Sequence, residues 1–176
     1  MKQLLNFILE RKSYDNLDIL FIRVGKTTPL LQKLIDLSPI IKEERKVNWD
    51  LIEVSRLHDL RNSGKLNKAD AVVLALELTD ENIGEIRRDF WEDFIWKYNP
   101  KPTAIVIPST TKLGSLSKSQ AIEALSLQRV TDRVWEIFEM ADGVDVEIHE
   151  WLLMAASKVV SDIQEELKDE EDQNSE

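Results

Sequence analysis

The stretch Leu17-Asp18-Ile19-Leu20-Phe21-Ile22-Arg23-Val24-Gly25-Lys26-Thr27-Thr28 carries the most informative pattern in this sequence. Residues 17–22 are an apolar run of strand length, and residues 29–37 have the pattern of a helix that begins at a proline. A strand, a tight loop with Gly-Lys-Thr and a helix are the layout of a phosphate-binding loop. In such a loop, backbone N–H groups surround a phosphate, the lysine adds positive charge and the threonine hydroxyl binds Mg²⁺. The candidate phosphate-binding residues are therefore Gly25, Lys26, Thr27 and Thr28, with Thr27 as the candidate Mg²⁺ ligand.

The motif is incomplete at its start. The full pattern needs a glycine five residues before Gly25, and that position is Leu20, inside the expected strand. Two interpretations follow. Either the loop still binds a phosphate, or Gly25 makes a turn, Lys26 is solvated and one of the two threonines caps the following helix.

Composition excludes several classes of function. The chain has 176 residues, which suits one domain, and no cysteine, so it has neither disulfides nor cysteine-based metal sites. The net charge is −10, and residues 165–176 contribute about −6 of it through seven acids and one lysine. Because no basic surface is apparent, nucleic-acid binding is not expected.

The sequence predicts three parts. Residues 1–16 form an amphipathic helix and a turn, residues 17–167 an α/β domain, and residues 168–176 an acidic disordered tail. The helix is expected to pack on the domain, and weak peripheral contact with a membrane or a partner is the alternative. No signal peptide or membrane span is apparent, so a cytoplasmic location is expected.

Apolar runs and helical periodicities alternate along the domain. Strands are expected at 17–22, 51–54, 69–76, 103–107 and 134–140, with a further extended segment at 40–41. Helices are expected at 29–37, 79–98, 117–125 and 144–167, and residues 56–68 are either helix or loop. Thr79 or Asp80 would cap the second helix, and a capping box of Ser117 and Gln120 the third. The fold class is therefore α/β: a single doubly wound, mostly parallel sheet with helices on both faces.

Several stretches in order resemble small GTPases of the Arf and Arf-like branch. Residues 17–34 resemble the first strand, GKTT loop and helix of that family, and 69–96 resemble its central strand and long helix. Ser119 to Leu127, Arg133 to Ile137, Asp142 to Val144 and Glu150 to Leu152 resemble the family's last elements. The chain is also similar to the beta subunit of the signal recognition particle receptor. The resemblance implies a P-loop fold, GTP or GDP with Mg²⁺ as the ligand, and GTP hydrolysis as the activity.

The same alignment shows changes at the nucleotide contacts. The guanine-reading Asn-Lys-x-Asp of the family falls on residues 108–111, Pro-Ser-Thr-Thr, which lack a carboxylate. Its Asp-x-x-Gly should follow the strand ending near Val54, where the sequence reads Ser55-Arg56-Leu57-His58. No glutamine stands where the attacking water would be oriented. We therefore expect weak or lost nucleotide binding and no catalytic residue.

Two hypotheses remain from the sequence. The first is a degenerate, non-switching GTPase fold that acts as a scaffold and binds a protein partner through the region Ile40–Lys68. The second is an atypical but active GTP-binding switch, with Lys26 on the phosphates and Thr27 on Mg²⁺. His58 and His149 are expected to be isolated polar residues without nearby acids, not catalysts or metal ligands. Lys65, Lys68 and Lys112 are expected to be surface charges.

Overall fold

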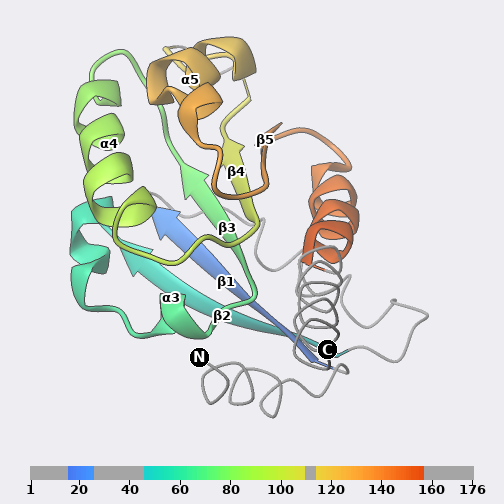
Figure 1. Cartoon of the computed structure of the whole chain (residues 1–176). Helices are drawn as coiled ribbons and strands as arrows, with labels where there is room; N and C mark the ends of the chain where they lie inside the picture. The colour runs from blue at the N-terminus through green and yellow to red at the C-terminus, as the bar shows by residue number, and fades with distance from the viewer. Residues whose placement is uncertain (1–15, 26–45, 110–113, 157–176) are drawn as a thin grey trace, which may run out of the picture.

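Five parallel strands form the sheet at the centre of the computed structural model, which describes residues 16–25, 46–109 and 114–156 (Figure 1). The strands lie in the order β2-β1-β3-β4-β5, and every neighbouring pair is parallel. Their bounds are β1 (Asn16–Val24), β2 (Lys46–Val54), β3 (Ala71–Leu76), β4 (Thr103–Ile107) and β5 (Trp135–Glu139). The predicted fold class, a doubly wound α/β sheet, is confirmed.

The central strands form because their residues are apolar on both faces. Every residue of β3 and of β4 is buried, as in a parallel strand covered by helices on both sides. Strand β2 is longer than the predicted 51–54, because it pairs with β1 residue by residue from Asn16↔Lys46 to Val24↔Val54. This ladder extends β2 into polar residues that would not predict a strand on their own. The predicted extended segment at 40–41 lies outside the described residues.

Helical segments follow most of the strands. The undecided region 56–68 contains a 3₁₀ helix and a short α-helix, and its three leucines Leu57, Leu60 and Leu66 are buried. The predicted helix 79–98 contains an α-helix that continues as a π-helical segment. The helical segments include η2 (Leu57–Asn62), α3 (Lys65–Lys68), α4 (Ile83–Asp89), η3 (Phe90–Ile95), α5 (Lys118–Leu125) and η4 (Leu127–Arg129). Residues 144–156 form a further helix.

One predicted helix cap is confirmed and another is wrong. Ser117 caps α5, where its Oγ accepts from the Gln120 N–H at 3.3 Å and Gln120 Oε1 accepts from the Ser117 N–H at 2.9 Å. By contrast, neither Thr79 nor Asp80 caps α4, whose N-cap is Asn82. The reason is a turn that Asn82 builds: its Oδ1 accepts from the Thr79 N–H at 2.8 Å and its Nδ2 donates to the Glu77 carbonyl at 2.7 Å.

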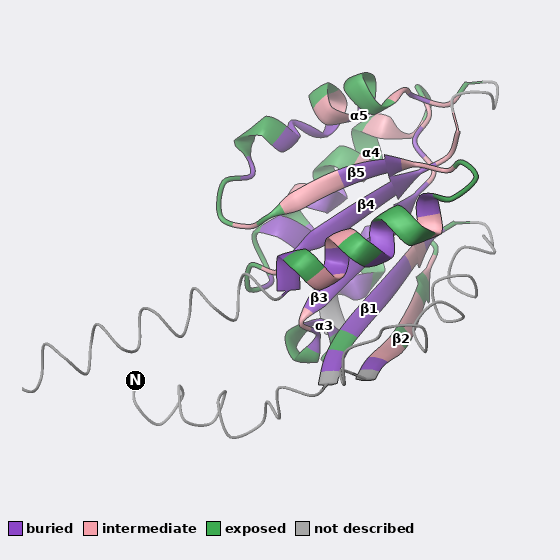
Figure 2. Cartoon of the chain, turned by 90° about the vertical axis from the view of Figure 1, so that its right-hand side faces the viewer, coloured by how far each residue is buried: buried purple, intermediate pink, exposed green. Residues whose placement is uncertain are grey.

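The sheet separates two cores. On one face, Leu20, Ile22 and Val24 of β1 pack with residues of η2, α4, η3 and α5. On the other face, Ile19 and Phe21 of β1 pack with Ile148 and Leu152 of helix 144–156, which crosses the sheet in Figure 2. The alternation of β1 residues between the two cores follows from the period of two of a strand. It explains why this strand reads as a continuous apolar run.

All five strands point the same way, so the segments after Val24, Val54, Leu76, Ile107 and Glu139 meet at one edge of the sheet. We call this the carboxyl edge. In sheets of this kind, ligands bind at such an edge. Within the described ranges, the helices are too short or too polar to cross a bilayer. The predicted N-terminal helix, the helix at 29–37, the end of the last helix and the acidic tail lie outside those ranges.

Candidate functional site at the carboxyl edge of the sheet

Gly25 begins the predicted phosphate loop at the end of β1. Its φ of +92° lies in the region that favours glycine, so the chain turns here as the motif requires. However, the Gly25 N–H donates to the Val54 carbonyl at 3.1 Å and so extends the ladder between β1 and β2. This N–H is therefore not available to a phosphate. Lys26, Thr27 and Thr28, the other predicted site residues, lie outside the described residues.

The loops after β3 and β4 are connected to each other at the same edge. The Leu116 N–H donates to the Leu78 carbonyl at 3.3 Å, and Thr79 forms an antiparallel bridge with Ser115. Pro108 and Ser109, the two described residues of the stretch that aligns with the guanine-reading motif, contain no carboxylate that could pair with a guanine base. Thr110 and Thr111 lie outside the described residues.

The segment after β2 is held by an ion pair to a buried carboxylate. The Arg56 guanidinium donates to both oxygens of Asp89, from Nε at 3.3 Å and from Nη2 at 3.1 and 3.3 Å, and also ion-pairs with Glu85. Asp89 is 2% exposed and also accepts from Arg88. The hydrogen bond to Asp89 raises the pKa of Arg56, so this guanidinium stays charged. Arg56 therefore connects the start of η2 to α4.

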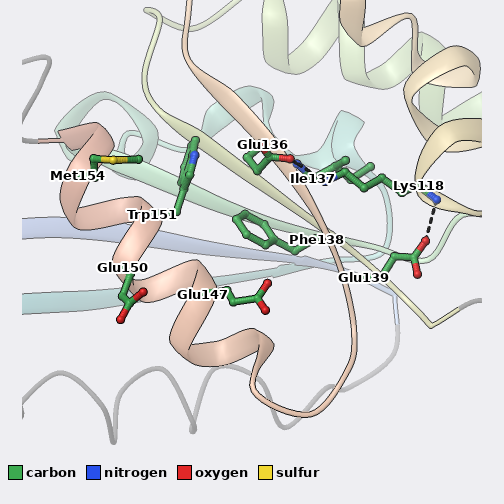
Figure 3. A pocket seen from close by; sticks show the side chains of 9 residues that line it. All are labelled: Lys118, Glu136, Ile137, Phe138, Glu139, Glu147, Glu150, Trp151 and Met154. Carbon is green, nitrogen blue, oxygen red and sulfur yellow. Dashed lines mark hydrogen bonds and ion pairs between the residues drawn. The ribbon is translucent and has the colours of Figure 1, made fainter.

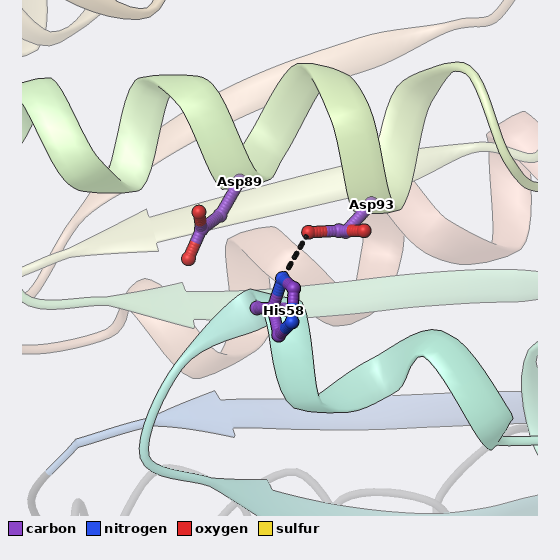
Figure 4. Close-up of side chains that lie close together, drawn as sticks. All are labelled: His58, Asp89 and Asp93. Carbon is purple, nitrogen blue, oxygen red and sulfur yellow. Dashed lines mark hydrogen bonds and ion pairs between the residues drawn. The ribbon is translucent and has the colours of Figure 1, made fainter.

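His58 adds a second contact, which connects η2 to η3. Its Nδ1 lies 3.1 Å from Oδ2 of Asp93, which is 1% exposed (Figure 4). The prediction that His58 is isolated from acids is therefore wrong. Arg56, His58, Asp89 and Asp93 together form what we call the η2 ion-pair cluster.

A divalent cation is the other occupant to consider for this cluster. The ligand atoms of His58, Asp89 and Asp93 lie within 4.8 Å of one another, the spacing of a metal site. Yet both oxygens of Asp89 already accept hydrogen bonds from guanidinium groups. A cation at this position would lie next to two fixed positive charges. The arrangement is therefore best described as an ion-pair cluster that fixes η2.

Apolar contacts and a hydrogen bond fix the rest of η2. Leu57 and Leu60 are 1% and 0% exposed and belong to the core cluster that contains Phe90 and Phe94. The Tyr98 hydroxyl donates to the Leu60 carbonyl. Burial and then the nearby negative charge of Asp93 raise the pKa of Tyr98, so the hydroxyl remains a donor. Leu57 and Leu60 thus hold η2 in the core of the domain.

The sequence contained a signal for the two buried acids. Asp89 and Asp93 each directly precede a phenylalanine of the apolar stripe, and they are four positions apart in the sequence. In a helix, residues four apart lie on the same face, so the two acids lie on one side of the helix, next to the stripe that contains the phenylalanines. Acids at such positions need cationic partners. The pattern alone does not show which cations those are.

His149 is buried in helix 144–156, and we therefore expect the stability of the domain to depend on pH. Burial lowers its pKa below the ordinary 6.5, against an opposing effect of Glu150, and Nε2 has no hydrogen-bond partner among the described residues. The folded protein therefore keeps His149 neutral where the unfolded chain is already protonated. The contribution of the neutral, buried His149 to the free energy of unfolding is present above pH 6.5. It is lost as the pH falls from 6.5 toward the lower folded-state pKa.

The variant His149→Leu removes the imidazole and with it this pH-dependent contribution to stability. In urea titrations, its free energy of unfolding relative to the parent is expected to be constant above about pH 7 and to rise as the pH falls to about 5.5. A relative stability that does not change with pH would contradict the assignment.

Comparisons with known proteins address the fold. No model of a known protein family matches the sequence, and no curated protein is similar to it. Among solved structures, the chain is similar to the Arl6 BBS3 small GTPase from Trypanosoma brucei, determined with the bound nucleotide analogue GppNp. The TM-score is 0.56 at 15% identity, over 81% of this chain and 98% of that chain. The chain therefore has the fold of an Arf-like small GTPase.

Proposed function

We propose that this protein is a non-switching member of the Arf-like GTPase fold that acts as a protein-binding module, with weak or lost nucleotide binding. The observation that carries the proposal is the fixed segment after β2. A GTPase switch needs a segment at this place that changes between two arrangements when the γ-phosphate is lost. Here Arg56 and His58 pair with buried carboxylates, and Leu57 and Leu60 are in the core.

Two features of the carboxyl edge support the proposal. The Gly25 N–H is used by the sheet, and each N–H donor lost to a phosphate removes about 1.5–3 kcal/mol of binding. The sequence Pro108-Ser109-Thr110-Thr111 offers no carboxylate for guanine, and loss of such a polar partner lowers discrimination by about 10⁴–10⁵. On these grounds we infer that tight, selective GTP binding is absent.

The partner surface that we propose remains Ile40–Lys68. In its described part, exposed residues begin within β2 and continue through α3. They are Asp50, Glu53, Ser55, Arg56, His58, Asp59, Gly64, Lys65, Asn67 and Lys68. A partner would thus meet a rigid, charged surface that is already formed, which lowers the entropy cost of binding. The proposal includes a cytoplasmic location, with the N-terminal segment as a weak membrane or partner contact.

The alternative is an active GTP-binding switch that hydrolyses GTP. It is favoured by the Gly25-Lys26-Thr27-Thr28 sequence and by the nucleotide analogue in the Trypanosoma brucei structure. In this case Lys26 would contact the phosphates and Thr27 the Mg²⁺ ion.

The variant Lys26→Ala distinguishes the two functions. The proposal predicts a Tm within about 2 °C of the parent, because a solvated lysine contributes little to stability. It also predicts that Mg²⁺ with GTP shifts the Tm of neither protein. Lys68→Ala, an exposed lysine in α3, is the control for loss of one positive charge. A GTP-dependent rise in Tm that Lys26→Ala abolishes and Lys68→Ala retains would support the alternative.

A further inference from the structure

Strand β5 forms an edge of the sheet, and part of its backbone faces away from β4. In the described residues β5 pairs with β4 alone. The Val134 carbonyl accepts from the Thr103 N–H and the Met140 N–H donates to the Ile107 carbonyl, both at 2.9 Å. In a parallel ladder alternate residues face the same neighbour, so the backbone groups of Trp135, Ile137 and Glu139 point outward.

A side chain of the same strand already accepts a hydrogen bond from one of these outward-facing backbone groups. The Ile137 N–H donates to Oε1 of Glu136 at 3.2 Å. The carboxylate thus takes the place that a carbonyl of an added strand would take. A charged residue at this position also protects the edge against pairing with other copies of the chain.

A groove runs beside this edge. Strand β5, the start of α5 and helix 144–156 line this open groove, which has a volume of about 670 Å³, and Figure 3 shows the side chains along it. Its polar lining is acidic: four glutamates, at positions 136, 139, 147 and 150, lie against one lysine. Lys118 Nζ is already paired with Glu136 at 2.8 Å, and its backbone N–H donates to Glu139 at 2.8 Å. The groove therefore has a net charge of −3, from four carboxylates and one ammonium group.

The apolar part of the lining is aromatic and partly open to solvent. Trp151 lies edge-on to Phe138, with ring centroids 6.1 Å apart, and Met154 next to it is 65% exposed. Aromatic faces beside carboxylates suit arginine, because its aliphatic stem packs on apolar surface while its guanidinium contacts a ring and a carboxylate.

We propose that this groove binds an extended, arginine-rich segment of a partner protein, which adds to the outer edge of β5 as a further strand. Backbone hydrogen bonds to Trp135, Ile137 and Glu139 would give affinity in such a complex. The acidic and aromatic lining would select arginine side chains. Glu136 would release the Ile137 N–H when the segment binds. This surface is formed by other elements than Ile40–Lys68, so the proposal does not depend on the function proposed above.

The test measures binding of a labelled peptide to the full chain by fluorescence anisotropy. The probe alternates arginine and valine over about eight residues, enough to pair along the length of β5. A matched peptide has proline in place of valine, with the same charge but without the N–H groups that a strand needs. We expect the arginine–valine peptide to bind at least about tenfold more tightly than the arginine–proline peptide. Equal affinities would overturn strand addition.

Variants of the lining then locate the site. Glu147→Gln with Glu150→Gln removes two charges of the groove, and Asp80→Asn with Glu81→Gln removes two exposed charges at the turn before α4. The first pair is expected to weaken binding of the arginine–valine peptide about tenfold, and the second to leave it unchanged. An equal effect of both pairs would mean that the peptide responds only to the net charge of −10, and would overturn the proposal.

Discussion

Replacing Leu60 with alanine is expected to lower the free energy of unfolding of the whole domain by about 2–5 kcal/mol. Leu60 is 0% exposed in a core cluster with Phe90 and Phe94, and its carbonyl accepts the hydroxyl proton of Tyr98. If segment 56–62 is part of the core, then the cavity left by the substitution destabilises the folded state as a whole. The measurement is chemical denaturation followed by circular dichroism.

A switch segment would respond differently to the same substitution. Segments that move in a functional cycle open locally at a small cost, so their loss leaves the global free energy of unfolding nearly unchanged. Asn67→Ala, an exposed position in α3, serves as the control and is expected to change this free energy by less than about 0.5 kcal/mol. A Leu60→Ala effect as small as that of the control would contradict the placement of η2 in the core.

The second large effect is expected when Arg56 is replaced with methionine. This variant removes the guanidinium that contacts both oxygens of Asp89, and the carboxylate, which is 2% exposed, keeps its hydrogen bonds from Arg88. An incompletely paired buried charge is costly, so the Tm should fall. Arg87→Met, at an exposed neighbouring position on α4, is the control and should leave the Tm close to that of the parent.

A double substitution separates loss of the ion pair from loss of packing. In the Arg56→Met background, Asp89→Leu removes the buried carboxylate that the first substitution left incompletely paired. Well-packed apolar residues often replace a buried ion pair at no cost, so the double variant should recover most of the lost Tm. If the Tm of the double variant falls by the sum of the effects of the two single substitutions, then the two residues do not act as a pair. In that case the η2 ion-pair cluster does not fix the segment.

The two central strands could be predicted because their sequences are apolar over almost their whole length. The predicted bounds of residues 103–107 match those of β4, since this strand is buried on both faces and its residues are apolar except for Thr103. The capping box of Ser117 and Gln120 depends only on residues close together in the sequence, and its prediction was also confirmed. By contrast, the first half of β2 could not be predicted, because pairing with β1 determines its structure.

The contacts of the candidate site could not be predicted from the sequence for a similar reason. His58 and Asp93 are 35 residues apart and Arg56 and Asp89 are 33 residues apart. Arg56 and His58 taken alone suggest solvated surface residues, and the pattern of Asp89 and Asp93 does not show their partners. Only the packing of η2 on α4 and η3 brings them together and buries the two carboxylates. The cap of α4 was wrong because Thr79, Asp80 and Asn82 are all good cap residues, and the turn built by Asn82 decides among them.

The nucleotide content of the purified protein tests the central claim, that this protein performs its function without bound GTP or GDP. The full chain is purified in Mg²⁺ without added nucleotide and denatured, and the supernatant is separated by ion exchange. A tightly bound ligand survives this procedure and, at a hundred times its Kd, would also stabilise the fold by about 2.7 kcal/mol. We expect no nucleotide peak and no rise in Tm on adding GTP. A stoichiometric peak of GDP or GTP would contradict the account.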